Sequence, residues 1–109
     1  MRQFTTPEQT AKLIELGFEK PCSIASVEPI YGMGGISVAK AYTIGELIEM
    51  LLSKPHCRGS IYNVGLRQYK VLFKKLINGR FKVLFHEVGY EPIDLVFNCI
   101  VKLKEEGVI

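Results

Sequence analysis

The chain of 109 residues is long enough for one ordinary domain and too short for two, so we expect a single domain over residues 1–109. Hydrophobic residues make up 48% and charged residues 23%, which excludes a disordered or low-complexity chain. The net charge of +3 hides a strong segregation of charge along the sequence. Segment 50–86 holds eight basic residues and no acidic one, whereas the remainder holds six basic and all eleven acidic residues, a balance of −5.

The ends of the chain and its cysteines point to a cytoplasmic protein. No apolar run approaches the roughly 18 residues of a membrane-spanning helix, and the first residues lack the apolar core of a secretory signal. Cys22, Cys57 and Cys99 have neither the number nor the spacing of a disulfide framework or a zinc site. We therefore expect reduced thiols, no bound metal and no cofactor.

The first predicted element is a helix at about 7–16. Thr6 suits the cap, Pro7 the first helical position, and Gly17 a left-handed C-terminal end. A hairpin is expected next, with a strand at 22–27 ended by Glu28-Pro29 and a second strand at 36–42. The glycine-rich turn at 31–35 between them lacks the residues of a phosphate-binding loop.

A second helix begins after Thr43, which forms a capping box with Glu46, and it ends near Leu52. A last helix begins near Glu91-Pro92 and ends at Gly107. Helical spacing predicts that the side chains of both helices are buried on single faces. The residues expected in the core are Leu47, Ile48, Leu51, Val96, Phe97 and Ile100, with Cys99 as a small buried hydrophobe beside them.

The middle of the chain allows two interpretations. Asn78-Gly79 favours a two-residue turn that pairs strand 69–77 with strand 80–88, and 60–66 would add a further strand. The apolar residues of 69–77 also fit a helix that ends near Gly79. We favour the hairpin because β-branched and aromatic residues dominate both arms.

The predicted hairpin has consequences for its side chains. Its pairing places Lys75 opposite Lys82, an unfavourable arrangement unless an anion or an acid relieves it. Alternation along the second arm predicts Phe81, Val83 and Phe85 on one face and Lys82 and His86 on the other. The fold class is therefore α+β, with about three helices packed on an antiparallel sheet built from hairpins.

Three blocks of the sequence support a resemblance. Residues 4–21, 41–51 and 101–109 resemble a family of small uncharacterised proteins from prophages and mobile elements of gut bacteria. The middle of the chain, about 53–90, does not share this resemblance. The resemblance implies a small cytoplasmic α+β protein of a phage or mobile element, and it implies no activity or catalytic residue.

No catalytic constellation stands out. His56 and Cys57 are adjacent, which suits neither a metal site nor a nucleophile with its base, and no third group orients them. We therefore expect a non-catalytic interaction module with an unknown protein partner, which is compatible with a homo-oligomer and needs no membrane.

The alternative is a nucleic-acid-binding protein that uses the basic segment 54–82, where aromatic residues alternate with basic ones. The candidate residues for an anion or nucleic acid are Arg67, Lys70, Lys74, Lys75, Arg80 and Lys82. A competing interpretation is that acidic side chains fold against these residues and neutralise them. The acidic residues in question are Glu46, Glu49, Glu87, Glu91 and Asp94.

Overall fold

The protein has an α+β fold with two separate antiparallel sheets, in agreement with the predicted class. The computed structural model describes the backbone of residues 4–21, 24–30 and 35–109, and the side chains of 4–21 and 40–109. The elements in chain order are α1 (Pro7–Glu15), β1 (Ile24–Ile30), β2 (Gly35–Lys40), α2 (Ile44–Leu51), β3 (Cys57–Gly65), β4 (Gln68–Ile77), β5 (Arg80–Gly89) and α3 (Pro92–Glu105).

Capping interactions define the first two helices as the sequence predicts. The Gln9 amide N–H donates to Thr6 Oγ1 at 3.2 Å, and the Thr6 amide donates back to Gln9 Oε1 at 3.0 Å. Thr43 and Glu46 form the same reciprocal box at the start of α2. Gly17 takes a φ of +98°, the left-handed conformation expected beyond the end of α1.

The first hairpin differs in its bounds from the prediction. β1 does not end at Glu28-Pro29 but continues to Ile30, with Pro29 paired to Ile36. Proline is tolerated there because both strands of a two-stranded sheet are edge strands, which leave some N–H groups unpaired. β2 ends at Lys40, before 41–42, and the Tyr42 backbone is hydrogen-bonded to Thr5 instead of to β1. The expected strand start at 22–23 and most of the glycine-rich turn lie outside the described residues.

The middle of the chain is a three-stranded antiparallel sheet in the order β3-β4-β5, so the helical alternative for 69–77 is wrong. Asn78 and Gly79 have φ values of 53° and 78°, the pair of positive angles that a type I′ turn needs. β3 starts at Cys57, three residues before the predicted start. Leu66 lies in the turn after β3 and is 91% exposed.

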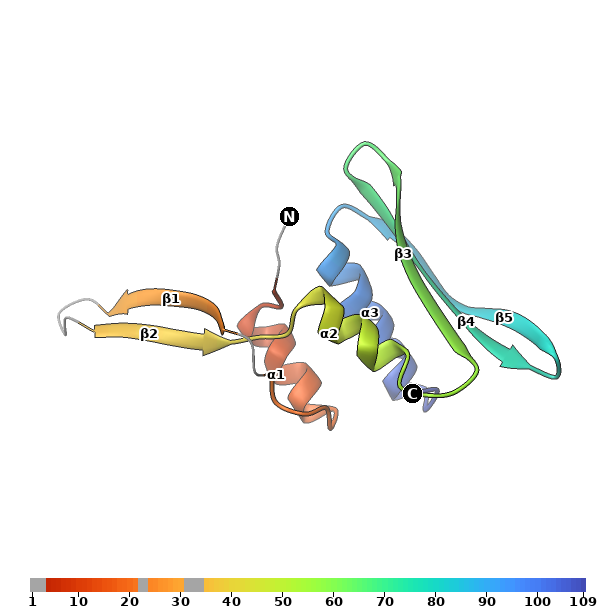
Figure 1. Cartoon of the computed structure of the whole chain (residues 1–109), viewed down its shortest axis with the longest axis horizontal. Helices are drawn as coiled ribbons and strands as arrows, with labels where there is room; N and C mark the ends of the chain where they lie inside the picture. Colours follow the sequence, from red (N-terminus) through yellow and green to blue (C-terminus); the bar gives the residue numbers. More distant parts are fainter. Residues whose placement is uncertain (1–3, 22–23, 31–34) are drawn as a thin grey trace.

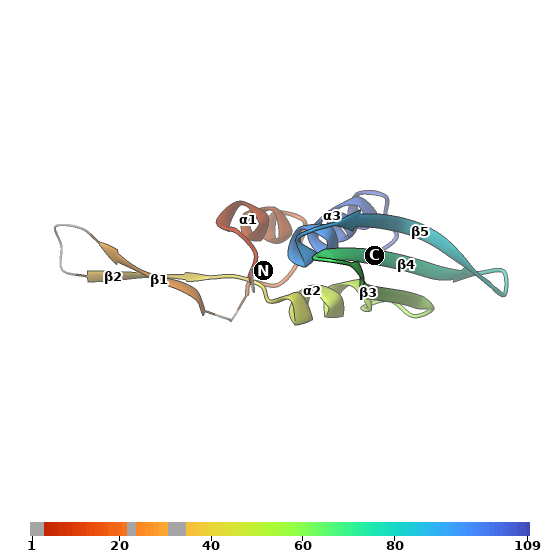
Figure 2. The ribbon, with the colours of Figure 1, turned by 90° about the horizontal axis from the view of Figure 1, so that it is seen from above.

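The helices lie on one side of this sheet (Figures 1 and 2). α3 packs on β4 and β5, and α2 packs on α3 and β3. α1 lies beside α3, where Gln9 Nε2 donates to Asp94 Oδ1 at 2.7 Å and Lys12 Nζ lies 3.7 Å from Glu105 Oε1. The β1–β2 hairpin and the tip of the β4–β5 hairpin extend from opposite ends of the molecule (Figure 1).

The core lies between α2, α3 and the sheet. Leu47, Leu51, Val96 and Ile100 are buried as predicted, and Cys99 is buried with them. Ile48 and Phe97 are partly buried, and Phe97 packs against the core. On α3 the fully buried stripe consists of Ile93, Val96, Cys99, Ile100 and Leu103, and Phe97 lies at its margin.

Candidate functional site

The described helices leave one side of the three-stranded sheet uncovered. Val71 and Phe73 of β4 are almost fully buried against the helices, with exposed fractions of 1% and 0%. Alternation along the strand therefore turns Lys70, Leu72 and Lys74 to the other side. The pairing of β4 with β3 and β5 then assigns a side to each neighbouring residue.

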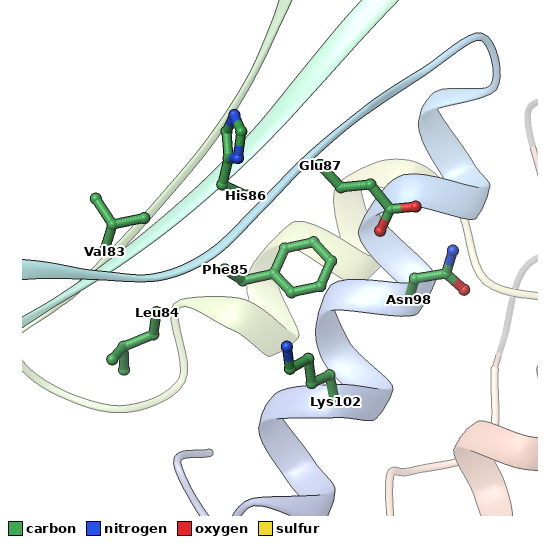
Figure 3. Close-up of a pocket in the computed structure, with 7 residues that line it drawn as sticks. All are labelled: Val83, Leu84, Phe85, His86, Glu87, Asn98 and Lys102. Atoms are coloured by element: carbon green, nitrogen blue, oxygen red, sulfur yellow. The ribbon is translucent and has the colours of Figure 1, made fainter.

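A bulge in β5 changes the alternation that the sequence suggests. Phe73 pairs with Phe85, but the next residue, Lys74, pairs with Val83, so Leu84 is an extra residue in β5. Phe81 and Val83 therefore lie on the uncovered side and Phe85 on the helical side, which corrects the prediction of one shared face. The positions of Lys82 and His86 are corrected for the same reason: Lys82 lies on the helical side and His86 on the uncovered side. Figure 3 shows Phe85 directed toward α3 and His86 away from it.

We call the uncovered side the open face. It is formed by alternate residues of all three strands: Arg58, Ser60 and Tyr62 of β3, Lys70, Leu72, Lys74 and Leu76 of β4, and Phe81, Val83, His86 and Val88 of β5. It contains no aspartate or glutamate. Three of its residues are basic, namely Arg58, Lys70 and Lys74, and several of its apolar side chains are exposed.

Aromatic and cationic groups contact each other on the open face. The Arg58 guanidinium carbon lies 4.5 Å from the centroid of the Phe81 ring, across the central strand. Phe81 is still 42% exposed, as is Tyr62. Tyr62 lies opposite Lys70 and Phe81 opposite Leu76, so the two residues are offset by six positions, or about 20 Å, along the direction of β4.

A third aromatic residue adjoins the open face at the start of β4. Tyr90 follows the last residue of β5 and is 71% exposed. Gln68 Nε2 donates a hydrogen bond of 3.3 Å to the Tyr90 hydroxyl, and Gln68 is on the same side of β4 as Lys70. Tyr90 therefore lies beside the end of the open face that contains Tyr62.

The structure divides the six predicted binding residues among three places. Lys70 and Lys74 lie on the open face. Lys75, Arg80 and Lys82 lie on the opposite side of the β4–β5 hairpin, near its tip. Arg67 lies in the β3–β4 turn at the other end of the sheet, with a φ of 57°.

The acidic side chains proposed as neutralising partners lie away from the open face. Glu46 caps α2, and Glu49 lines a shallow hollow formed by α2 and the segment after α1. Glu87 lies on the helical side of β5, near Asn98 of α3 (Figure 3). Glu91 and Asp94 lie at the start of α3. The ion pair recorded among the side chains of 4–21 and 40–109 joins Lys12 to Glu105 and involves no residue of 54–82.

Other reactive groups do not assemble into a catalytic site. A shallow hollow between β5 and α3 contains His86 and Glu87, but these side chains point to opposite sides of the strand (Figure 3). Cys57 and Cys99 are free thiols, while Cys22 lies outside the described residues. Burial, with a smaller contribution from the Glu87 carboxylate, raises the pKa of the Cys99 thiol to about 12. Among the described residues, no three potential ligands cluster to hold a metal.

Sequence reasoning missed several residues that belong to this surface. Arg58 was outside the predicted strand, which began at residue 60, and neither Tyr62 nor Tyr90 was selected as a binding residue. The alternation of Arg58, Ser60 and Tyr62 is the signal that could have placed them on one face. The β5 bulge has no comparable signal, because Leu84 does not interrupt the apolar run in which it lies.

Comparisons of this chain with protein-family models, with curated proteins and with solved structures found no match. The resemblance of residues 4–21, 41–51 and 101–109 to a family from prophages and mobile elements therefore stays a prediction. In the part of the chain that the structure describes, every helix is too short or too polar to cross a membrane.

Proposed function

We propose that this chain is a non-catalytic binding protein whose open face takes single-stranded nucleic acid. The observation that supports this proposal is the composition of the open face, in which exposed aromatic side chains lie among cations and no acidic residue is present. This composition favours the nucleic-acid alternative over a protein partner, because uncompensated cations attract a polyanion.

The aromatic residues supply the contacts to bases. A sheet surface with exposed rings can stack unpaired bases, and such stacking tolerates any sequence because every base has a flat face. Tyr62 and Phe81 are exposed near opposite ends of the open face, and Tyr90 extends the end near Tyr62. A duplex hides its base faces within the stack, so the proposed site prefers single strands.

The cations supply the contacts to phosphates. Lys70 and Lys74 lie four residues apart on the same side of the central strand, and Arg58 is the register partner of Lys74. Three phosphate contacts on a single strand correspond to a slope of about −2 for the logarithm of the binding constant against the logarithm of the salt concentration.

Fluorescence anisotropy with a labelled oligothymidine tests the proposal. We expect binding that weakens with salt at about that slope, and weaker binding to a duplex of equal length. In Lys70→Gln/Lys74→Gln the slope should become flatter by about 1.4. In Lys20→Gln/Lys40→Gln, which removes the same charge at exposed positions outside the three-stranded sheet, the slope should not change.

The aromatic contribution requires a separate variant. Phe81→Ala should weaken binding by about 1–3 kcal/mol with little change in the salt slope, because it removes a stacking surface and no charge. If the wild-type protein does not bind oligonucleotides at low salt, the proposal is wrong and a protein partner becomes the better hypothesis. If Lys20→Gln/Lys40→Gln weakened oligonucleotide binding as much as Lys70→Gln/Lys74→Gln does, binding would depend only on the net charge of the protein.

The proposed setting is the cytoplasm of a cell that carries a mobile element. This part of the proposal rests on the resemblance of residues 4–21, 41–51 and 101–109 and on the free thiols of Cys57 and Cys99. It adds nothing to the binding mechanism and is tested separately, by fractionation of the natural host.

A further inference from the structure

Three cations lie close together on the back of the β4–β5 hairpin, on the opposite side from the open face. Lys75 of β4 is the register partner of Lys82 of β5, as the sequence predicts. Arg80 lies two residues before Lys82 and therefore on the same side of β5. We call these three residues the back cluster. Arg80 and Lys82 are exposed and Lys75 is partly buried.

The back cluster contains an unfavourable charge arrangement. Directly opposed side chains in an antiparallel pair have Cβ atoms about 4.5–5.5 Å apart, so like charges at Lys75 and Lys82 repel each other. The other register partner of Lys75 is Cys57, which carries no compensating carboxylate. No ion pair to the cluster occurs within the described residues. An anion between the two ammonium groups would convert this repulsion into two attractions.

The back cluster and the open face are separated by a single strand. β5 is an edge strand, so no further strand of its sheet blocks the path around it. Along β5, residues of the back cluster alternate with Phe81 and Val83 of the open face. A flexible polymer that leaves the open face near Phe81 therefore meets Arg80 and Lys82 as soon as it passes the edge.

Resting on the proposed function, we infer that the back cluster is a second phosphate-binding site for the same single strand. The strand stacks on the open face, crosses the free edge of β5 and places a phosphate between Lys75 and Lys82. A short oligonucleotide fills the open face alone, whereas a longer one reaches both sites. The back cluster thus adds affinity that depends on length.

The test compares two oligothymidines, of about 4 and about 12 nucleotides, which span the range of site sizes of single-strand-binding folds. For wild-type protein we expect the longer probe to bind with the steeper salt slope. In Lys75→Gln/Lys82→Gln the slope for the longer probe should become flatter by about 1.4, and binding of the short probe should not change. Lys20→Gln/Lys40→Gln is the charge-matched control, and thermal unfolding establishes that each variant is folded.

The outcomes separate this inference from the proposed function. If the short probe binds and the variant retains the full slope for the longer probe, the back cluster is not a phosphate site, while the open-face proposal stands. If the variant weakens both probes equally, the cluster acts only through net charge and the inference is again overturned. If neither probe binds the wild-type protein, both proposals fail. Arg80→Gln leaves the lysine pair intact. In this variant the salt slope for the longer probe should become flatter by about 0.7, half the change expected for the double variant.

Discussion

Cys99 illustrates how burial controls the chemistry of a single residue. Its side chain is fully buried within the α3 core stripe, and burial together with the nearby Glu87 raises the pKa of the thiol to about 12. Thiolates rather than thiols react with alkylating reagents. In the folded protein at pH 8, iodoacetamide should therefore modify the partly exposed Cys57 and spare Cys99, as measured by peptide mass spectrometry. Labelling of Cys99 at the rate of Cys57 would contradict the buried position.

The same residue should make stability depend on alkaline pH. The folded state keeps the Cys99 proton up to about pH 12, whereas an unfolded chain releases it near 9.0. The folded state then binds more protons than the unfolded state, so the free energy of unfolding falls as pH rises above about 9. Burial and the charges of Glu46 and Glu19 raise the pKa of Tyr42 as well, and its contribution has the same sign.

Urea unfolding at a series of pH values checks this linkage. Cys99 and Tyr42 should not change the free energy of unfolding with pH below about pH 9. Above that pH, the free energy of unfolding should decline. Cys99→Ala should flatten the decline, because it removes the larger of the two shifts. An unchanged slope in this variant would show that Cys99 does not hold its proton in the folded state.

The opposed Lys75 and Lys82 lead to a further prediction at the residue scale. Lys82→Gln should raise the free energy of unfolding by about 0.2–1 kcal/mol at low salt, because it removes a directly opposed like charge. The gain should shrink at high salt, where screening weakens the repulsion. Lys20→Gln serves as the control and should change stability little. A loss of stability in Lys82→Gln would indicate that the side chain has an attractive contact.

At the scale of elements, the β4–β5 turn depends on a positive φ. Gly79 has a φ of 78°, and a Cβ at this position would meet no atom within 4 Å. Gly79→Ala should therefore destabilise the protein by about 1–2 kcal/mol through backbone strain alone. Gly45→Ala is the contrasting variant: Gly45 lies exposed within α2, and alanine there should stabilise by about 0.5–1 kcal/mol. Urea unfolding measures both, and equal signs would contradict the account.

Local signals explain which elements could be predicted. Capping boxes at Thr6 and Thr43 and the Asn78-Gly79 turn act within a few residues, so sequence alone located α1, α2 and the main hairpin. The β5 bulge depends on how a strand fits its neighbour and on the packing of Leu84 against the core. Strict alternation therefore placed Phe85 on the wrong face relative to Phe81.

At the scale of the whole molecule, one phenylalanine of β4 and one of α3 differ in how deeply they are buried in the core. Phe73 is fully buried between the sheet and the helices, whereas Phe97 is only partly buried. Phe73→Ala should cost about 3–5 kcal/mol of unfolding free energy, and Phe97→Ala clearly less. Chemical denaturation of both variants checks the order. The reverse order would mean that α3 presents a different face to the sheet.

The basic segment of the sequence contributes cations to both sides of the three-stranded sheet, and the open face contains no acidic residue. Composition alone identifies the basic segment and predicts Lys70 and Lys74 as binding residues, but it does not indicate the side of the strand on which they lie. Which cations share a face depends on strand register and on the bulge, both of which arise from pairing between distant residues. For this reason the folded structure, and not the sequence pattern, places Arg58 on the open face.

The most direct test of the central claim is a nuclear magnetic resonance titration of the folded protein with a short oligothymidine. Backbone and aromatic resonances of the open face should shift, with the largest changes at Tyr62, Lys70 and Phe81, while resonances of α1 and α2 should stay in place. Shifts confined to the helices, or no shifts at low salt, would contradict the assignment of the open face as a single-strand-binding surface.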